Sequence, residues 1–345
     1  MNREHCFWPA EWHPQSAVQI AWPDEHTDWA NHLDEVIECY KRIVPEIAAR
    51  QSLIVVCRNS EKTKRQIADA CGNSRHIKFV EAPLNDTWAR DHGPIITLCG
   101  KKPVLLDFKF NGWGLKYPAN YDNQITARIY AAGILNQAAE YRNHLSFVLE
   151  GGSIESDGQG TVLTTASCLL SPNRNGGYTK DEIKSSLKSY LYADRILWME
   201  NGYLAGDDTD GHIDTLARFC SPDTIAYVKC DDPADEHYLC LKEMERELKS
   251  FNTRKGTSYQ LIPLPMADPV FDDDGSRLPA TYANFLIING AVLIPFYGSA
   301  KDGLVSKIFQ SLFKKRSIIG IDCRVLIKEH GSLHCMAMQY PEGVI

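Results

Sequence analysis

One unit of local structure recurs along this 345-residue chain and restricts its fold more than any other feature. Each copy begins with a polar motif, continues through an apolar strand, a tight turn and a second strand, and then enters a helix. About five copies of roughly 60–70 residues can be recognised. A supersecondary unit that returns at a fixed period is typical of radial or solenoid repetition.

The boundaries of these units follow from β-rich runs, turn residues and apolar spacing. Thr179 and Glu182 have the spacing of a capping box, which predicts the start of one helix. The predicted strands lie at 17–21, 52–57, 95–98, 104–108, 153–155, 161–165, 213–219, 224–228, 285–288, 291–295 and 332–339. The predicted helices lie at 30–50, 61–70, 124–137, 179–191, 235–249 and 304–313.

These units predict an α/β fold, a closed and pseudo-symmetric propeller of five blades. The last predicted strand is expected to join the N-terminal strands in the remaining unit. Since no linker of low complexity interrupts the chain, residues 1–345 are expected to form a single domain. A two-layer α/β sandwich has a similar local pattern and is the alternative architecture.

Composition excludes several classes of partner. The net charge is −7 and the isoelectric point is near 5.9, which argues against nucleic acid and anionic membranes as partners. No apolar run approaches the length of a membrane span. An acidic balance is compatible with a small cationic substrate.

The 11 cysteines indicate the redox compartment. Their number is odd and they include no C-x-x-C pair, unlike a zinc site or a secreted disulfide framework. Reduced thiols in a cytosol are therefore expected. Residues 1–9 contain no apolar core of a signal peptide, which also predicts a cytoplasmic protein.

Three chemically active side chains stand at the start of successive predicted hairpins. Asp91 precedes Glu150 by 59 residues, and Glu150 precedes His212 by 62. If rotation about one axis relates the units, equivalent positions converge on that axis. These residues, distant in sequence, are then expected to share one central site.

The residue types predict attack on a cationic carbon. Cys335 is the candidate nucleophile, although any one of 11 cysteines could simply be a core residue. His212 is the candidate general acid and base. Asp91 and Asp214 could bind a guanidinium group from two sides. Glu150 is expected to pair with His212, raise its pKa and keep it protonated.

Two further residues are candidates for substrate binding, and one rival reading concerns a metal. Trp88, close to Asp91, could pack against a cationic or aliphatic ligand, or be a core indole. Asp208 lies near His212 and is the second candidate. A cluster of aspartates surrounds His212, so a metal-dependent hydrolase is the rival: Asp207, Asp208, Asp210 and Asp214.

These motifs together resemble the agmatine deiminase family of the guanidino-group-modifying, pentein-fold superfamily. The resemblance covers nearly the whole chain and rests on six motifs in order: FWPAEW at 7–12 with AWP at 21–23, NDTWARDHGP at 85–94, FNGWGLKY at 110–117, EGGSI at 150–154, DDTDGHID at 207–214 and HC at 334–335. Two motifs depart from the family pattern. The C-terminal Gly-Gly-Asn-Ile-His-Cys is here Gly-Ser-Leu-His-Cys, and Thr215 replaces the usual Asn.

The resemblance implies hydrolysis of agmatine to N-carbamoylputrescine and ammonia, in polyamine biosynthesis. Cys335 would attack the guanidinium carbon and form an amidino-cysteine, Asp91 and Asp214 would hold the nitrogens, and His212, supported by Glu150, would transfer protons. Neither cofactor nor metal is implied. The assembly state, a homo-oligomer included, stays open.

Peptidyl-arginine and free arginine are the alternative substrates, and a catalytically silent agmatine-binding propeller is the alternative to an enzyme. Related enzymes that act on arginine use arginine side chains to hold the substrate carboxylate. The segment 92–120 contains no Arg, which favours the decarboxylated substrate.

Overall fold

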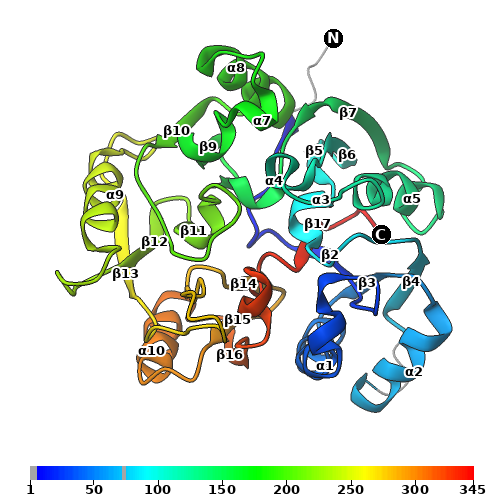
Figure 1. The fold of residues 1–345 in the computed structure, drawn as a ribbon. Coiled ribbons are helices and arrows are strands. Elements are labelled where there is room, and N and C mark those ends of the chain that lie inside the picture. The colour runs from blue at the N-terminus through cyan, green and yellow to red at the C-terminus, as the bar shows by residue number, and fades with distance from the viewer. Residues whose placement is uncertain (1–5, 72–74) are drawn as a thin grey trace, which may run out of the picture.

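Five small sheets surround a central axis in the computed structural model, which describes residues 6–71 and 75–345 (Figure 1). The chain passes around the ring blade by blade, and its two ends meet in one sheet. The predicted five-bladed α/β propeller is confirmed, and the two-layer sandwich is not formed. Residues 1–5, part of the segment on which the signal-peptide prediction rests, lie outside the described residues.

All five blades share one strand plan, an antiparallel pair whose second strand has a parallel partner on its other side. In chain order the blades contain β5 (Ile95–Cys99), β6 (Lys102–Lys109) and β7 (Glu140–Val148); β8 (Ile154–Ser156), β9 (Thr161–Thr165) and β10 (Arg195–Met199); β11 (Ala217–Ser221), β12 (Thr224–Lys229) and β13 (Gln260–Pro265); β14 (Leu286–Ile288), β15 (Ala291–Phe296) and β16 (Ser317–Asp322); and β17 (Ala337–Pro341), β2 (Gln15–Ala21), β3 (Ser52–Cys57) and β4 (Ile77–Glu81). The short β1 (Cys6–Phe7) pairs with the outer edge of β5.

The longer helices lie at the outside of the ring (Figure 1). They are α1 (Leu33–Ala48), α2 (Ser60–Cys71), α5 (Ile125–Ala131), α8 (Lys180–Leu191), α9 (Tyr238–Ser250) and α10 (Asp302–Leu312). The predicted capping box of α8 is confirmed, because the Thr179 hydroxyl accepts from the Glu182 N–H at 3.3 Å and the Glu182 carboxylate accepts from the Thr179 N–H at 2.7 Å.

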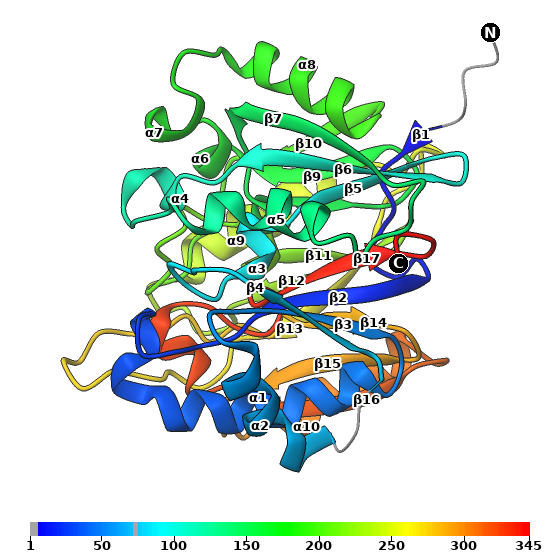
Figure 2. The ribbon, with the colours of Figure 1, turned by 90° about the vertical axis from the view of Figure 1, so that its right-hand side faces the viewer.

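Shorter helical segments lie between blades and strands. They are α3 (Ala89–His92), α4 (Gly112–Leu115), α6 (Ala166–Leu169) and α7 (Pro172–Asn175), with 3₁₀ turns η1 (Asp28–His32), η2 (Asp122–Gln124), η3 (Gly151–Ser153), η4 (Ile213–Thr215) and η5 (Leu326–Glu329). In the side view, α4 lies at one end of the ring, while β1, the β5–β6 turn and the C-terminus lie at the other (Figure 2).

Three details of the predicted elements were wrong. The run 213–219 is not one strand, since Ile213–Thr215 form a 3₁₀ turn before β11. The helix predicted at 124–137 ends at Ala131, where Gly133 with a φ of +66° stops it. The last strand starts at Ala337 rather than at 332.

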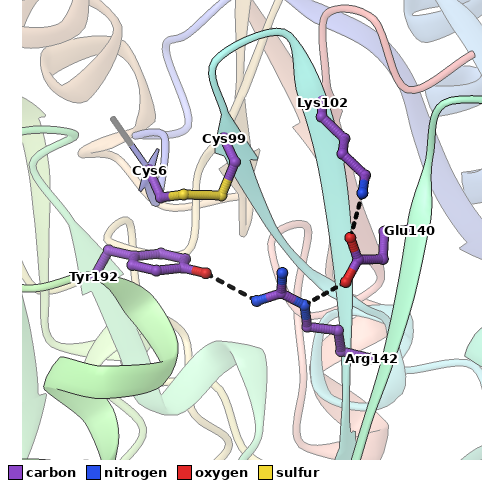
Figure 3. The surroundings of a disulfide bond; sticks show 6 residues. All are labelled: Cys6, Cys99, Lys102, Glu140, Arg142 and Tyr192. Carbon is purple, nitrogen blue, oxygen red and sulfur yellow. Dashed lines mark hydrogen bonds and ion pairs between the residues drawn. A yellow bond between two sulfur atoms is a disulfide. The ribbon is translucent and has the colours of Figure 1, made fainter. Parts of the chain in front are cut away.

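A disulfide joins Cys6 of β1 to Cys99 of β5 (Figure 3). The prediction of reduced thiols is therefore wrong for this pair, while the other nine cysteines are free. The two cysteines are direct partners in the β1–β5 ladder, so the pairing of the strands brings the sulfurs together. Within residues 6–71 and 75–345, no helix has the length and apolar character needed to cross a membrane.

Candidate active site

The predicted residues lie on short segments that precede the first strand of a blade. Asp91 is in α3 before β5, and Glu150 directly precedes η3 before β8. His212 and Asp214 are at η4 before β11, and Cys335 is two residues before β17. Because η3 packs against both α3 and η4, and α3 packs against β17, the structure gathers these residues at the centre of the ring.

The thiol of Cys335 lies against an amide and a carboxylate. Its Sγ is 3.2 Å from Asn284 Nδ2 and 3.8 Å from Asp214 Oδ2. Burial raises the pKa of Cys335 well above its usual value, and the charges of Asp214 and Asp91 raise it further. The thiol is therefore protonated at neutral pH in this environment, and a cation placed between the carboxylates would favour the thiolate.

Asp91 receives neutral hydrogen-bond donors. Its Oδ1 accepts from the Gly152 N–H at 2.9 Å, and its Oδ2 accepts from the Trp113 indole N–H at 2.9 Å. Burial raises the pKa of Asp91 well above its usual value, and Asp214 adds to the effect.

Asp214 has an imidazole as its partner instead. His334 Nδ1 lies 2.7 Å from Asp214 Oδ2, and Oδ1 of the same carboxylate is buried with no hydrogen-bond partner among the described residues. Burial alone would raise the pKa of Asp214, but the hydrogen bond and charge of His334, with a further contribution from Arg218, lower it below the usual value. Asp214 is thus an ionised carboxylate with one acceptor available.

The predicted pairing of Glu150 with His212 was wrong in detail. Arg174 Nε donates to both oxygens of Glu150, at 2.9 and 3.0 Å, and neither ring nitrogen of His212 has a hydrogen-bond partner in the described part of the chain. Burial, aided by the charge of Arg174 and opposed by that of Asp214, lowers the pKa of His212 to about 3. His212 is therefore neutral, with its Nδ1 3.6 Å from Asp91 Oδ1.

Gly152 shows how small the central space is. A Cβ added there would lie 2.6 Å from His212 Nδ1, 2.8 Å from Asp91 Oδ1 and 3.1 Å from Asp214 Oδ2. The side chains of His212, Asp91 and Asp214 therefore leave no room at Gly152 for one additional carbon atom.

One group of side chains has donor atoms close enough to hold a metal ion. A carboxylate oxygen of Glu150, Cys168 Sγ and a nitrogen of His212 all lie within 4.8 Å of one another. The guanidinium of Arg174 occupies both oxygens of Glu150, so a metal would have to displace a cation. Two of the four aspartates that suggested a metal site have other partners: Asp207 accepts from the Gly211 N–H, and Asp210 pairs with Arg174 and Lys116.

A cavity of about 80 Å³ opens from the thiol. Both predicted substrate-binding residues, Trp88 and Asp208, line it. The remaining lining residues are Asp28, Asp86, Asp91, Trp113, Tyr117, Thr209, Thr215, Glu329, His330, Gly331 and Cys335.

Carboxylates dominate the wall of this cavity, and among the described residues that line it none is Lys or Arg. Burial raises the pKa of Asp86 well above its usual value, and Asp28 raises it further. Burial, together with Asp28, raises the pKa of Glu329 to about 7. These carboxylates therefore repel one another, and a cation between them would relieve the repulsion.

Several site residues were not predicted. Asn284, Arg174 and His334 contact the candidate catalytic groups, yet only His334 stood in a motif and it had no role. Trp113 belongs to the FNGWGLKY motif and has a φ of +54° in a run of left-handed residues, a conformation that costs a non-glycine residue about 1 kcal/mol. In this backbone conformation the indole N–H of Trp113 points toward Asp91 Oδ2.

The family model of the Porphyromonas-type peptidyl-arginine deiminases matches residues 7–341. The chain belongs to this family. It is 32% identical to agmatine deiminase from Pseudomonas aeruginosa, over 96% of this chain and 95% of that one. The predicted family resemblance is thereby confirmed, and the chain is a guanidino-group deiminase, a hydrolase.

Two solved structures share the fold over almost the whole length. Agmatine deiminase from C. jejuni, solved with substrate bound, is 35% identical, covers 99% of this chain with 98% of its own, and has a TM-score of 0.91. A Porphyromonas gingivalis protein named provisionally as an arginine deiminase is 50% identical, covers 99% of this chain with 100% of its own, and has a TM-score of 0.93. The predicted pentein fold is confirmed, while these relatives carry different substrate names.

Proposed function

We propose that this deiminase hydrolyses agmatine to N-carbamoylputrescine and ammonia. The observation that carries the proposal is the charge of the cavity: its wall contains Asp28, Asp86, Asp208 and Glu329 and, among the described residues that line it, neither Lys nor Arg. Agmatine has a guanidinium at one end and an ammonium at the other. Such a wall attracts an ammonium and repels the carboxylate of free arginine.

The guanidinium is held between the two aspartates. Asp214 offers its unpartnered Oδ1, and Asp91 ionises when the cation arrives because opposite charge favours its charged form. Both aspartates raise the pKa of Cys335, and neutralising them favours the thiolate. The positive charge of the substrate thus favours ionisation of the Cys335 thiol.

The proton of the Cys335 thiol passes to neutral His212, and the thiolate then forms a C–S bond with the guanidinium carbon. The C–N bond breaks as His212 returns the proton to the departing ammonia, leaving the amidino-cysteine. His212 next takes a proton from water, the water oxygen bonds to the same carbon, and the C–S bond breaks. The hydroxyl proton of the tetrahedral intermediate passes to the sulfur and regenerates the thiol, and the ureido product leaves. His212 returns to its neutral form by releasing the water proton to solvent, where it converts ammonia to ammonium.

This scheme starts from a Cys335 thiol and a neutral His212, whereas a protonated His212 was expected. A thiolate with imidazolium and a thiol with imidazole contain the same number of protons, and the opposite pKa shifts of Cys335 and His212 favour the neutral pair before substrate binds. Glu150 then acts on Arg174 rather than directly on His212.

A product assay tests the proposal. Ammonia and ureido products are measured with agmatine, free arginine and an arginine-containing peptide, with Cys335→Ala as the inactive control. We expect kcat/KM to be at least about 100-fold higher for agmatine than for arginine. Higher activity on the peptide or on arginine would assign the site to peptidyl-arginine or arginine instead.

A further inference from the structure

A buried glutamate from the N-terminal loop reaches the centre of the ring. Glu11 lies between β1 and β2, and only 4% of it is exposed. Its carboxylate accepts from the Ile287 N–H at 2.5 Å and lies 2.5 Å from Arg218 Nη2 and 2.6 Å from His334 Nε2. This contact explains why FWPAEW, a motif with no part in the reaction described above, extends to the catalytic centre.

His334 connects this glutamate to the active site. Its Nε2 faces Glu11 and its Nδ1 lies 2.7 Å from Asp214 Oδ2. An ionised carboxylate only accepts hydrogen bonds, so both ring nitrogens must donate, and a ring that donates from both nitrogens is an imidazolium. The charge of Glu11 stabilises this cation inside the protein.

The imidazolium in turn acts on Asp214. It occupies Oδ2, which leaves Oδ1 as the acceptor without a partner. The other charged and titratable groups that face this carboxylate are His212, Arg218, Arg90, Asp91 and Cys335. None of these groups hydrogen-bonds both Asp214 and Glu11 among the described residues, whereas His334 does.

We propose that Glu11 and His334 are positioning residues of the deiminase reaction: Glu11 keeps His334 doubly protonated, and His334 keeps Asp214 ionised and turned so that Oδ1 receives the guanidinium. The consequence for substrate rests on the proposed function, whereas the charge of His334 does not. If the role of Glu11 were purely structural, replacing it would leave both the charge of the His334 imidazole and the pH dependence of agmatine binding unchanged.

Glu11→Gln is the test variant and Glu155→Gln is its matched control. Both carboxylates are buried and both pair with Arg218, at 2.5 Å each, but only Glu11 hydrogen-bonds His334. Thermal unfolding first checks that each variant folds. Nitrogen NMR of ¹⁵N-histidine-labelled protein at pH 7, with His334→Asn to assign the signals, then reports the ring state.

We expect a doubly protonated His334 ring in the parent and in Glu155→Gln, and a singly protonated ring in Glu11→Gln. A singly protonated ring in the parent, or an unchanged ring in Glu11→Gln, would overturn the proposal.

Agmatine binding supplies the second measurement, by calorimetry in a Cys335→Ser background that blocks turnover. From pH 8 to pH 6, we expect Glu11→Gln to lose about tenfold in affinity relative to its background. This is the loss expected if the buried Asp214 carboxylate, no longer held ionised by an imidazolium, becomes about nine-tenths protonated at pH 6. Glu155→Gln should follow the background. Equal pH dependence of the two variants contradicts the proposal.

If Glu11→Gln does not fold, His334→Asn replaces it in the binding measurement. The amide can donate to Asp214 but carries no charge, so the same tenfold loss is expected, and binding as in the background would overturn the proposal. If the background binds no agmatine at either pH while the NMR result holds, the proposed substrate fails and the Glu11–His334 pair stands.

Discussion

At the scale of the residue, Asp91 and Asp214 show that the partner of a side chain decides its charge. Both are buried aspartates at the centre of the ring, yet the pKa of Asp91 is raised and that of Asp214 is lowered. Asp91 has the indole of Trp113 and a backbone N–H, whereas Asp214 has the imidazole of His334. One carboxylate is ionised before substrate arrives, and the other responds to it.

Asp91→Asn should change two properties in opposite directions. Without the second carboxylate, kcat/KM for agmatine should fall by about 100-fold or more. Because the charge of Asp91 raises the pKa of Cys335, the same variant should react faster with iodoacetamide between pH 8 and 9. Alkylation rates are compared with those of Cys335→Ala, and slower alkylation would contradict this electrostatic coupling.

Glu329 should make substrate binding depend on pH. Its pKa is raised to about 7, so the carboxylate is neutral below that pH and charged above it. The KM for agmatine should therefore fall as pH rises from 6 to 8, and Glu329→Gln should weaken this trend. Butylguanidine, which has no ammonium, is the matched substrate, and an equal trend for both compounds would remove Glu329 from tail binding.

At the scale of the element, short turns rather than strands contain the candidate catalytic residues. Asp91, Gly152 and Asp214 belong to α3, η3 and η4, each of which stands just before the first strand of a blade. Such turns place backbone N–H groups and side chains close together at the axis. Their packing leaves no room for a larger residue at Gly152.

Gly152→Ala should abolish catalysis without unfolding the ring. The new methyl would lie within 2.6–3.1 Å of His212, Asp91 and Asp214, and a displacement of about 1 Å costs roughly 100-fold in rate. Gly177→Ala is the control, since a Cβ there meets nothing within 4 Å. An unchanged kcat in Gly152→Ala would show that catalysis does not depend on the positions of His212, Asp91 and Asp214 around Gly152.

The β1–β5 disulfide should stabilise the fold. The linked cysteines are 93 residues apart, and a bond closing such a loop contributes about 2–4 kcal/mol by restricting the unfolded chain. Dithiothreitol should therefore lower the Tm of the native protein. It should leave the Tm of Cys6→Ser/Cys99→Ser unchanged, and an unchanged Tm in both would show that the pair adds no stability.

The sequence predicted elements that have a local signal and missed those that do not. Hairpins such as β5–β6 were predicted because a turn separates two apolar runs. β4, β7, β10, β13 and β16 were missed, since each follows a helix and no turn pairs it with its parallel partner. β3 also follows a helix but was predicted, because residues 53–57 form a continuous apolar run.

The same reasoning applies to the site. Its central residues were predicted because they occupy equivalent places before successive hairpins. The cavity wall was predicted only in part. Asp208 was a candidate because it lies near His212, and Asp86 stood in a motif without a role, whereas Asp28 and Glu329 come from segments outside the motifs and meet the others only in the folded chain. Likewise, Glu150 pairs with Arg174 of α7, and no local motif in the sequence indicates that α7 packs beside Glu150.

At the scale of the whole molecule, the five blades are expected to unfold together. Every blade contributes to one ring, and the site is built from segments of several blades, so the loss of one blade exposes the core of its neighbours. Calorimetry should show a single transition whose calorimetric and van't Hoff enthalpies agree. Two separated transitions would contradict the prediction that residues 1–345 form one domain.

Because pairing of β17 with β2 completes the ring, the order of synthesis determines when the enzyme can become active. β17 pairs with β2, whose residues are made more than 300 positions earlier, and Cys335 is two residues before β17. During synthesis, β2 must therefore wait without this antiparallel neighbour while the other four blades emerge. Cys335, the proposed nucleophile, is synthesised after the strands of the other four blades. A growing chain is therefore expected to be inert toward guanidines until those blades have been made.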